Sequence, residues 1–220
     1  MLDTLVIEPP QKAKASVILL HGLGASGHDF AFVVPELKLP SDHTIRFVFP
    51  HAPEQPVSLN EGHIMPAWYD IFGLGMHSKE DTQGIRQAAT RVQKLIESEE
   101  AKGIEPHRIV LGGFSQGGAM ALYTALRYPK SLGGVLALST YLPVADTLLA
   151  EKSAANQQTP IWMAHGLQDL VVSMSLAQYS LEYLEKLQYP VQFQTYPMAH
   201  TLSSSELKAI GQWLQRRLVE

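Results

Sequence analysis

The stretch Gly113-Phe-Ser-Gln-Gly117 decides the fold of this chain. It has the form G-x-S-x-G, in which a tight turn between a strand and a helix exposes a strained serine, and small flanking residues avoid clashes. The run Arg108-Ile-Val-Leu111 before it predicts a buried strand, and residues 118–126 after it predict a helix. This context makes Ser115 a candidate nucleophile. The alternative is a glycine-rich connection that only packs a helix close to a sheet.

Short runs rich in β-branched and aromatic residues alternate with segments of helical periodicity on both sides of this stretch. Strands are predicted at residues 4–8, 16–20, 45–49, 134–138, 161–164 and 191–196. We expect the first two, separated by Pro9 and Pro10, to form an antiparallel pair. Helices are predicted from about residue 85 to Gly103, over 176–187 and over 207–218. Strands that alternate with helices in this way predict a mostly parallel central sheet with helices on both faces.

Length and composition limit the classes of protein to consider. The chain has 220 residues without a repeat or linker, which predicts a single domain over residues 1–220. The net charge of -4 is not concentrated in a block, so neither nucleic acid nor an anionic membrane is an expected partner. The absence of cysteine excludes disulfides and a cysteine nucleophile. Without a signal-like start or a long apolar stretch, we expect a cytoplasmic protein with no membrane insertion.

Two polar residues that follow predicted strands could activate the serine. A serine hydroxyl reacts when a base takes its proton, and the base needs a third group to hold its tautomer. Asp169 and His200 lie just past the carboxyl ends of strands, the edge of the sheet where Ser115 also lies. The order Ser, Asp, His selects His200 as general base, because His165, the other histidine after Ser115, precedes Asp169. Asp169 is the predicted orienting acid, with Asp146 as the main alternative.

Two backbone N–H groups are predicted to stabilise an oxyanion. One belongs to Gln116, the residue after the serine, at the start of a helix. The other belongs to Leu23 in the loop His21-Gly-Leu-Gly24, which leaves a predicted strand. His21 itself is interpreted as a structural residue that closes a buried strand. The sequence has neither an H-E-x-x-H pattern nor clustered carboxylates, so no metal is expected.

The segment from residue 50 to residue 78 lacks a clear period and is long for a loop in a compact domain. It carries many large apolar side chains and leaves the strand 45–49 at the edge where Ser115 lies. We therefore predict that it forms one wall of an acyl pocket, with Met65, Trp68 and Phe72 as substrate-binding residues. For Trp68, sealing the core beneath the loop is an equal alternative.

Several segments carry a further signal: Leu20-His-Gly-Leu-Gly24, Phe49-Pro-His-Ala-Pro53, Met65 with Trp68-Tyr-Asp70, Gly112-Gly-Phe-Ser-Gln-Gly-Gly118, Leu136-Ala-Leu-Ser-Thr-Tyr141, His165-Gly with Asp169, and Tyr196-Pro-Met with His200. Together they resemble the phospholipase/carboxylesterase family, which includes acyl-protein thioesterases and small bacterial carboxylesterases. The resemblance implies a serine esterase of the α/β-hydrolase fold that needs no cofactor, with the triad and oxyanion donors named above. The segment Phe72-Gly-Leu-Gly-Met-His77 departs from the family's pattern, so the resemblance does not extend to acyl-chain preference.

These observations predict a serine carboxylesterase or thioesterase that forms an acyl-enzyme on Ser115 and hydrolyses short- to medium-chain esters or thioesters. Its substrate would be a small acyl ester or an acylated protein, and a weak homodimer is also considered. The stretch between Thr140 and Pro160 is too short for a lid domain, so an open site is expected. The alternatives are another hydrolase, such as a lactone hydrolase or a peptidase, and a binding module without catalysis on the same fold.

Overall fold

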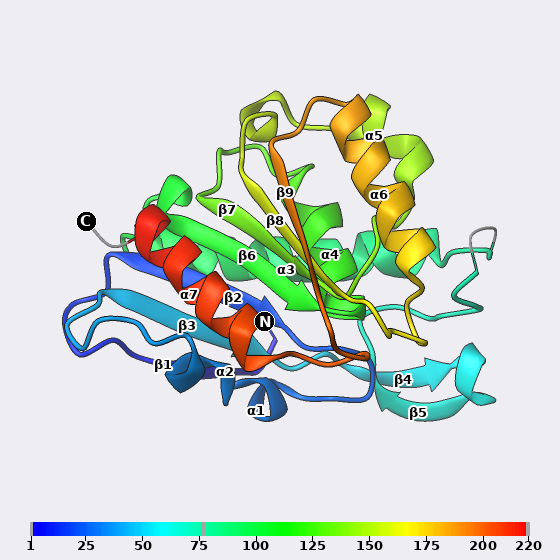
Figure 1. The fold of residues 1–220 in the computed structure, drawn as a ribbon, viewed down its shortest axis with the longest axis horizontal. Helices are drawn as coiled ribbons and strands as arrows, with labels where there is room; N and C mark the ends of the chain where they lie inside the picture. The colour runs from blue at the N-terminus through cyan, green and yellow to red at the C-terminus, as the bar shows by residue number, and fades with distance from the viewer. Residues whose placement is uncertain (1, 76–77, 219–220) are drawn as a thin grey trace.

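The strand that precedes Ser115 lies at the centre of the main sheet in this computed structural model, which describes residues 2–75 and 78–218 (Figure 1). The sheet has seven strands in the order β1-β3-β2-β6-β7-β8-β9. Their bounds are β1 Thr4–Ile7, β2 Ala15–Leu20, β3 Ile45–Pro50, β6 Ile109–Phe114, β7 Gly134–Leu138, β8 Ile161–Gly166 and β9 Val191–Tyr196. β1 is antiparallel to β3, and the other neighbouring pairs are parallel. The prediction of a mostly parallel sheet is confirmed.

The expected antiparallel pair of the first two strands is wrong, because β1 pairs with β3 and not with β2. β1 and β2 lie on opposite sides of β3, so the chain between them crosses that strand. A tight hairpin needs residues with positive φ in its turn, whereas Pro9 and Pro10 have φ fixed near -65°. The two prolines therefore favour an extended crossing over a hairpin.

Helices cover both faces of the main sheet, as expected. Their bounds are α1 Gly27–Phe30, α2 Val33–Glu36, α3 Thr82–Ala101, α4 Gln116–Ala125, α5 Ala145–Glu151, α6 Met174–Lys186 and α7 Ser204–Leu218. Figure 1 shows α7 in front of the sheet and α3 and α4 behind it. Side chains along β2 alternate between the two cores: Ile18 packs into the cluster with α3 and α4, and Val17 into the cluster with α1, α2 and α7. Within the described residues, no helix is both long and apolar enough to span a bilayer.

The segment without a clear period contains a two-stranded antiparallel sheet, β4 (Glu54–Val57) and β5 (His63–Pro66). This hairpin lies beyond the carboxyl ends of the main strands, at the lower right of Figure 1. Most of its side chains are at least partly exposed, and both strands contain a proline, so neither shows the alternation of a half-buried strand. Between β7 and β8 the described chain forms only α5 and a short 3₁₀ turn, Ala154–Asn156, and no lid covers the sheet.

The amino ends of the central strands are held by a buried carboxylate. Glu99, near the end of α3, is 2% exposed and accepts a hydrogen bond of 2.6 Å from the Ser16 hydroxyl on β2. It also forms ion pairs with Arg46 on β3 at 3.2 Å and with Lys102 at 2.6 Å. Several partners compensate the loss of hydration that burial imposes on the charge. This cluster ties α3 to the sheet at the end opposite to Ser115.

Candidate active site

Ser115 occupies a strained turn between β6 and α4. Its φ of 55° and ψ of -122° lie outside the regions that a residue with a side chain normally adopts. A Cβ on Gly113 would lie 2.3 Å from the carbonyl carbon of Gly117, and one on Gly117 would lie 2.1 Å from the Leu20 oxygen. The flanking glycines are therefore needed for the chain to pass this closely. The Thr140 hydroxyl donates a hydrogen bond of 2.6 Å to the Ser115 carbonyl and helps to hold the turn.

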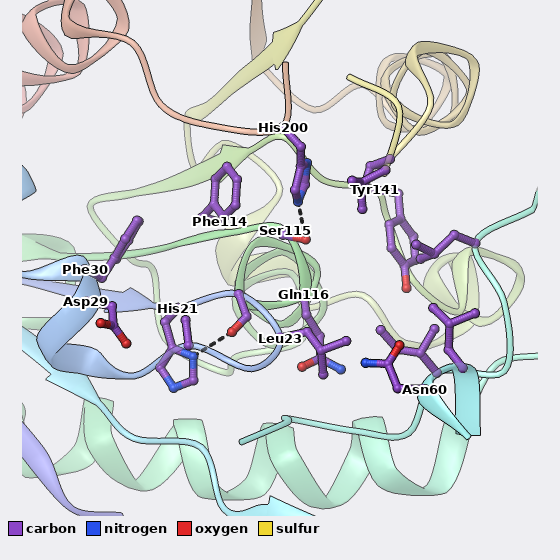
Figure 2. A pocket seen from close by; sticks show the side chains of 17 residues that line it. His21, Leu23, Asp29, Phe30, Asn60, Phe114, Ser115, Gln116, Tyr141 and His200 are labelled. Carbon is purple, nitrogen blue, oxygen red and sulfur yellow. Dashed lines mark hydrogen bonds between the residues drawn. The ribbon is translucent and has the colours of Figure 1, made fainter. Parts of the chain in front are cut away.

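The structure brings Ser115, His200 and Asp169 together in the predicted order. The Ser115 hydroxyl oxygen lies 2.9 Å from His200 Nε2, and His200 Nδ1 lies 2.7 Å from Asp169 Oδ2 (Figure 2). Because the carboxylate can only accept, Nδ1 carries the proton, and the Nε2 lone pair faces the hydroxyl. The Phe114 ring, 4.7 Å from the His200 ring between centroids, packs beside it. The arrangement can take the hydroxyl proton at the moment when Ser115 attacks.

The Asp169 carboxylate is buried, with no exposed side-chain surface, and both of its oxygens are satisfied. Oδ1 accepts hydrogen bonds of 2.9 Å from the N–H groups of Val171 and Val172. Oδ2 faces His200 and lies 3.5 Å from Nε2 of His165, which donates to the Val172 carbonyl at 2.8 Å. These contacts hold the carboxylate in one orientation. The alternative acid, Asp146, lies in the first turn of α5 and lines a different cavity.

The loops that carry Asp169 and His200 are joined by their backbones. The N–H of Leu167 donates to the carbonyl of Tyr196 at 2.8 Å, and the N–H of Gln168 donates to that of Met198 at 3.0 Å. A Cβ on Gly166 would lie 2.4 Å from the Met198 carbonyl oxygen, so only glycine allows this approach. The two loops therefore hold their side chains in a fixed relative position.

The two predicted oxyanion donors lie beside the serine. Leu23, Ser115 and Gln116 line one cavity, and Figure 2 shows Leu23 and Gln116 close together below the serine, on the side away from His200. Gln116 is the first residue of α4, where a backbone N–H has no partner within the helix and the helix dipole favours negative charge. These N–H groups are suited to a carbonyl oxygen that becomes negative.

The cavity that contains Ser115 and His200 has a volume of about 340 Å³ and walls made mostly of apolar side chains. The segment 50–78, which contains the β4–β5 hairpin and is called the hairpin segment below, supplies Leu59, Asn60, Ile71 and Leu74. The other walls include Phe30, Phe114, Tyr141 and Val171. Burial raises the pKa of Tyr141 to about 12, so its hydroxyl, 2.9 Å from that of Tyr69, stays neutral. Such a pocket suits an acyl chain next to a reacting carbonyl.

None of the three side chains predicted to bind substrate lines this cavity. Trp68 is 1% exposed and packs under the loop, where its indole N–H donates to the His21 carbonyl at 2.8 Å. Met65 does not line the cavity, and its sulfur accepts a hydrogen bond from the Asn60 side-chain amide. Phe72 is 44% exposed and lies outside the cavity's lining. The segment does line the cavity, but through other residues than the three expected, because the hairpin sets the directions of its side chains.

Among the described residues, no three His, Asp or Glu side chains come together in the way that would hold a metal ion. The cavity's titratable side chains are Asp29, His21, Tyr141 and His200. Burial lowers the pKa of His21, which favours its neutral ring. The chemistry that these groups support is proton transfer and nucleophilic attack by Ser115.

Known proteins resemble this chain over nearly its whole length. The model of a family described as Phospholipase/Carboxylesterase matches residues 2–218. The chain is 40% identical over 223 residues to acyl-protein thioesterase 1 of Gibberella zeae, covering 97% of this chain and 95% of that protein. It is 38% identical to acyl-protein thioesterase 1 of Yarrowia lipolytica, covering 96% of each. The crystal structure of acyl-protein thioesterase 2 of Zea mays superposes with a TM-score of 0.87 at 31% identity, covering 99% of this chain and 100% of that one.

Proposed function

Because the chain belongs to the phospholipase/carboxylesterase family and is a hydrolase of ester or thioester bonds, we propose that Ser115 is its nucleophile, His200 its general base and Asp169 the orienting acid. The observation that carries these roles is the continuous set of contacts from Asp169 Oδ2 through the His200 ring to the Ser115 hydroxyl, at 2.7 and 2.9 Å.

In the first half of the reaction, His200 Nε2 takes the proton of Ser115 as the hydroxyl oxygen attacks the acyl carbonyl carbon. The carbonyl oxygen gains a negative charge, which accepts hydrogen bonds from the N–H groups of Leu23 and Gln116. His200 then gives its proton to the departing thiol or alcohol, and the acyl group stays on Ser115 as an ester.

In the second half, a water molecule takes the place of the leaving group. His200 removes a proton from the water, whose oxygen attacks the acyl-enzyme, and a second oxyanion forms at the same two N–H groups. The bond to Ser115 breaks, Ser115 recovers its proton from His200, and a carboxylic acid is released. Asp169 keeps the His200 ring in the required tautomer through both halves and stays ionised.

For the substrate, we propose an acyl thioester on a protein, with the short- to medium-chain acyl group in the apolar cavity. The names of the fungal relatives support the acylated protein. The cavity of about 340 Å³ and the absence of a lid over the described residues support an acyl chain of limited length on a large carrier. In this arrangement the carrier stays outside and only its acyl group enters.

A fluorophosphonate probe tests the nucleophile. We expect the wild type to gain the mass of one adduct, and Ser115→Ala to lose both labelling and about 10⁶ in kcat. Ser205→Ala, on the exposed side of α7, is the matched control and should behave as the wild type. Release of free thiol from an S-acylated peptide tests the substrate class. Turnover by Ser115→Ala at a rate near that of the wild type would exclude Ser115 as the nucleophile. Hydrolysis of oxygen esters but not of thioesters would exclude a thioester as the substrate.

A cytoplasmic location and a weak homodimer also remain proposals. Cell fractionation followed by immunoblotting checks the location. The exposed apolar side chains Leu170, at 97%, and Ile64, at 69%, support self-association. Sedimentation velocity over a range of concentrations checks the dimer, which a constant monomer value up to the highest concentration would exclude.

A further inference from the structure

His21 is the first residue after β2 and is 1% exposed, and both of its ring nitrogens are engaged by backbone atoms. The N–H of Ala52 donates to Nε2 at 3.0 Å, and Nδ1 lies 2.8 Å from the Gly22 carbonyl oxygen. A backbone N–H can only donate, so Nε2 is the acceptor. The proton of the neutral ring is therefore on Nδ1 and is donated to Gly22.

The Gly22 carbonyl and the Leu23 N–H belong to one peptide group. The described chain has no cis peptide bond, so these two groups are coplanar and point in opposite directions. A bond from His21 Nδ1 to the Gly22 oxygen therefore also sets the direction of the Leu23 N–H. This N–H donates to no acceptor among the described residues, and Leu23 lines the cavity beside Ser115. In Figure 2 the His21 ring is turned away from Ser115, and a dashed line marks the hydrogen bond of its Nδ1.

A second contact joins the same loop to the other oxyanion donor. The Trp68 indole N–H donates to the His21 carbonyl at 2.8 Å, and its ring packs 5.2 Å from the His21 ring between centroids. The backbone N–H of Trp68 donates to the side-chain oxygen of Gln116 at 2.9 Å, and the Gln116 amide donates to the Tyr69 carbonyl at 2.7 Å. All four residues are buried. The loop of Leu23 and the start of α4 are thus tied to the same short segment.

We propose that His21 is a positioning residue for the oxyanion hole: its neutral ring fixes the Gly22–Leu23 peptide so that the Leu23 N–H faces the developing charge, and Trp68 holds this loop in register with Gln116. The inference rests on the proposed function, because it assigns a role within the same site. His21 does not touch the substrate in this role and acts through the backbone.

The surroundings of His21 favour the neutral ring that this role requires. Burial lowers the pKa of His21, and His51 lowers it further, while the bond to Gly22 and the Asp29 carboxylate oppose this. A protonated ring would point an N–H at the N–H of Ala52, so protonation would break one of the two contacts.

The test compares His21→Phe, His21→Asn and Trp68→Phe in the full chain. Phenylalanine keeps the ring but has no donor, whereas the asparagine amide can still donate to Gly22. His43→Phe is the matched control, because His43 also accepts a backbone N–H, at 3.2 Å, but precedes β3 at the opposite end of the sheet. The readouts are kcat and KM for a butyryl thioester and the Ki of an alkyl trifluoromethyl ketone, which forms an oxyanion with the serine.

For His21→Phe we expect kcat to fall by about 10²-fold with KM within about twofold, because an oxyanion donor acts only when charge develops. The Ki of the ketone should rise by the same factor as kcat/KM falls. His21→Asn should recover at least tenfold of the loss, Trp68→Phe should show a smaller loss, and His43→Phe none. If His21→Phe does not fold, His21→Asn and Trp68→Phe carry the comparison.

Three results would overturn the inference: unchanged kcat in folded His21→Phe, an unchanged Ki despite a lower kcat, or equal losses in the phenylalanine and asparagine variants. Each of these requires an active wild type. A wild type that neither hydrolyses the thioester nor reacts with a fluorophosphonate at Ser115 would instead overturn the proposed function, and this inference with it.

Discussion

The two oxygens of the Asp169 carboxylate make different contacts. One oxygen accepts two backbone N–H groups and fixes the side chain, and the other faces His200 at 2.7 Å. An amide in this position could keep the first set of contacts but would favour the wrong tautomer of His200. The roles of the two oxygens can therefore be separated by one substitution.

We predict that Asp169→Asn lowers kcat by about 10⁴ while the protein stays folded. Asp146→Asn is the control, because Asp146 lies on α5 and lines a different cavity. Steady-state kinetics with a butyryl thioester, together with circular dichroism of each variant, make the comparison. Equal losses in the two variants, or a larger loss in Asp146→Asn, would remove Asp169 from the proposed triad.

Residue positions could be predicted where the backbone alone determines them. Ser115, Asp169 and His200 follow strand ends, so the topology brings them together, and the structure places them within hydrogen-bonding distance. The directions of Trp68 and Phe72 depend on how the hairpin folds, which a segment without clear periodicity does not reveal. The role of His21 depends on the direction of one peptide group, and nothing in a sequence specifies that.

At the scale of the elements, the loop after β8 and the loop after β9 approach each other closely at Gly166. Gly166→Ala would place a Cβ 2.4 Å from the Met198 carbonyl oxygen, so the loops must separate. We predict a loss of kcat of about 10²-fold for a displacement of about 1 Å. Gly103→Ala is the control: the φ of 89° strains an alanine there, but nothing lies within 4 Å of the added Cβ. It should lower the melting temperature without changing kcat.

A normal kcat in Gly166→Ala would show that the two loops can move apart without cost to the reaction.

The hairpin segment is the other element that shapes the site, and it can be tested independently. Leu59 and Phe72 both belong to it and are similarly exposed, at 43% and 44%, but only Leu59 lines the cavity.

Leu59→Ala should therefore change the dependence of kcat/KM on acyl-chain length, and Phe72→Ala should not. Each CH₂ group that loses a buried contact costs up to about 0.8 kcal/mol, which is up to about 15-fold in kcat/KM per two carbons. A series of acyl thioesters from acetyl to decanoyl, assayed with both variants, makes the measurement. Equal losses at every chain length in Leu59→Ala would assign this side chain to packing and not to the acyl pocket.

For the whole molecule, we propose that residues 1–220 form a single domain, since two buried apolar clusters share one sheet. Thermal unfolding should then show one transition, with equal calorimetric and van't Hoff enthalpies. Two separate transitions would indicate independent units. The alternation of strands and helices was enough to predict the sheet, whereas the pairing of β1 was not predictable, because it depends on a crossing that leaves no periodic pattern.

The stability of the molecule should depend on pH through Glu206. This residue forms a reciprocal cap with Ser203 at the start of α7, is fully buried, and leaves Oε1 without a partner among the described residues. Burial raises its pKa to about 7. The folded state therefore keeps a proton that the unfolded state has already lost above its ordinary pKa, near 4.3, so stability falls as the pH rises from there to about 7.

Glu206→Gln keeps an acceptor for the Ser203 N–H and removes the charge. We predict that its free energy of unfolding exceeds that of the wild type increasingly between pH 5 and pH 8, by up to about 3 kcal/mol. Urea denaturation at several pH values measures the difference. A difference that is constant over this range would show that Glu206 does not lose its proton there.

The buried cluster around Glu99 holds the amino ends of β2 and β3, whereas the proposed catalytic residues all follow carboxyl ends. The buried charges that hold the fold and the residues that form the proposed site therefore lie at opposite ends of the strands. Directed evolution can use this division. A library confined to the cavity-lining residues Leu59, Asn60 and Leu74 would vary the acyl pocket while the buried Trp68 and Tyr69 and the cluster around Glu99 stay unchanged, so that variants selected for a new acyl chain need no compensating mutations at the other edge.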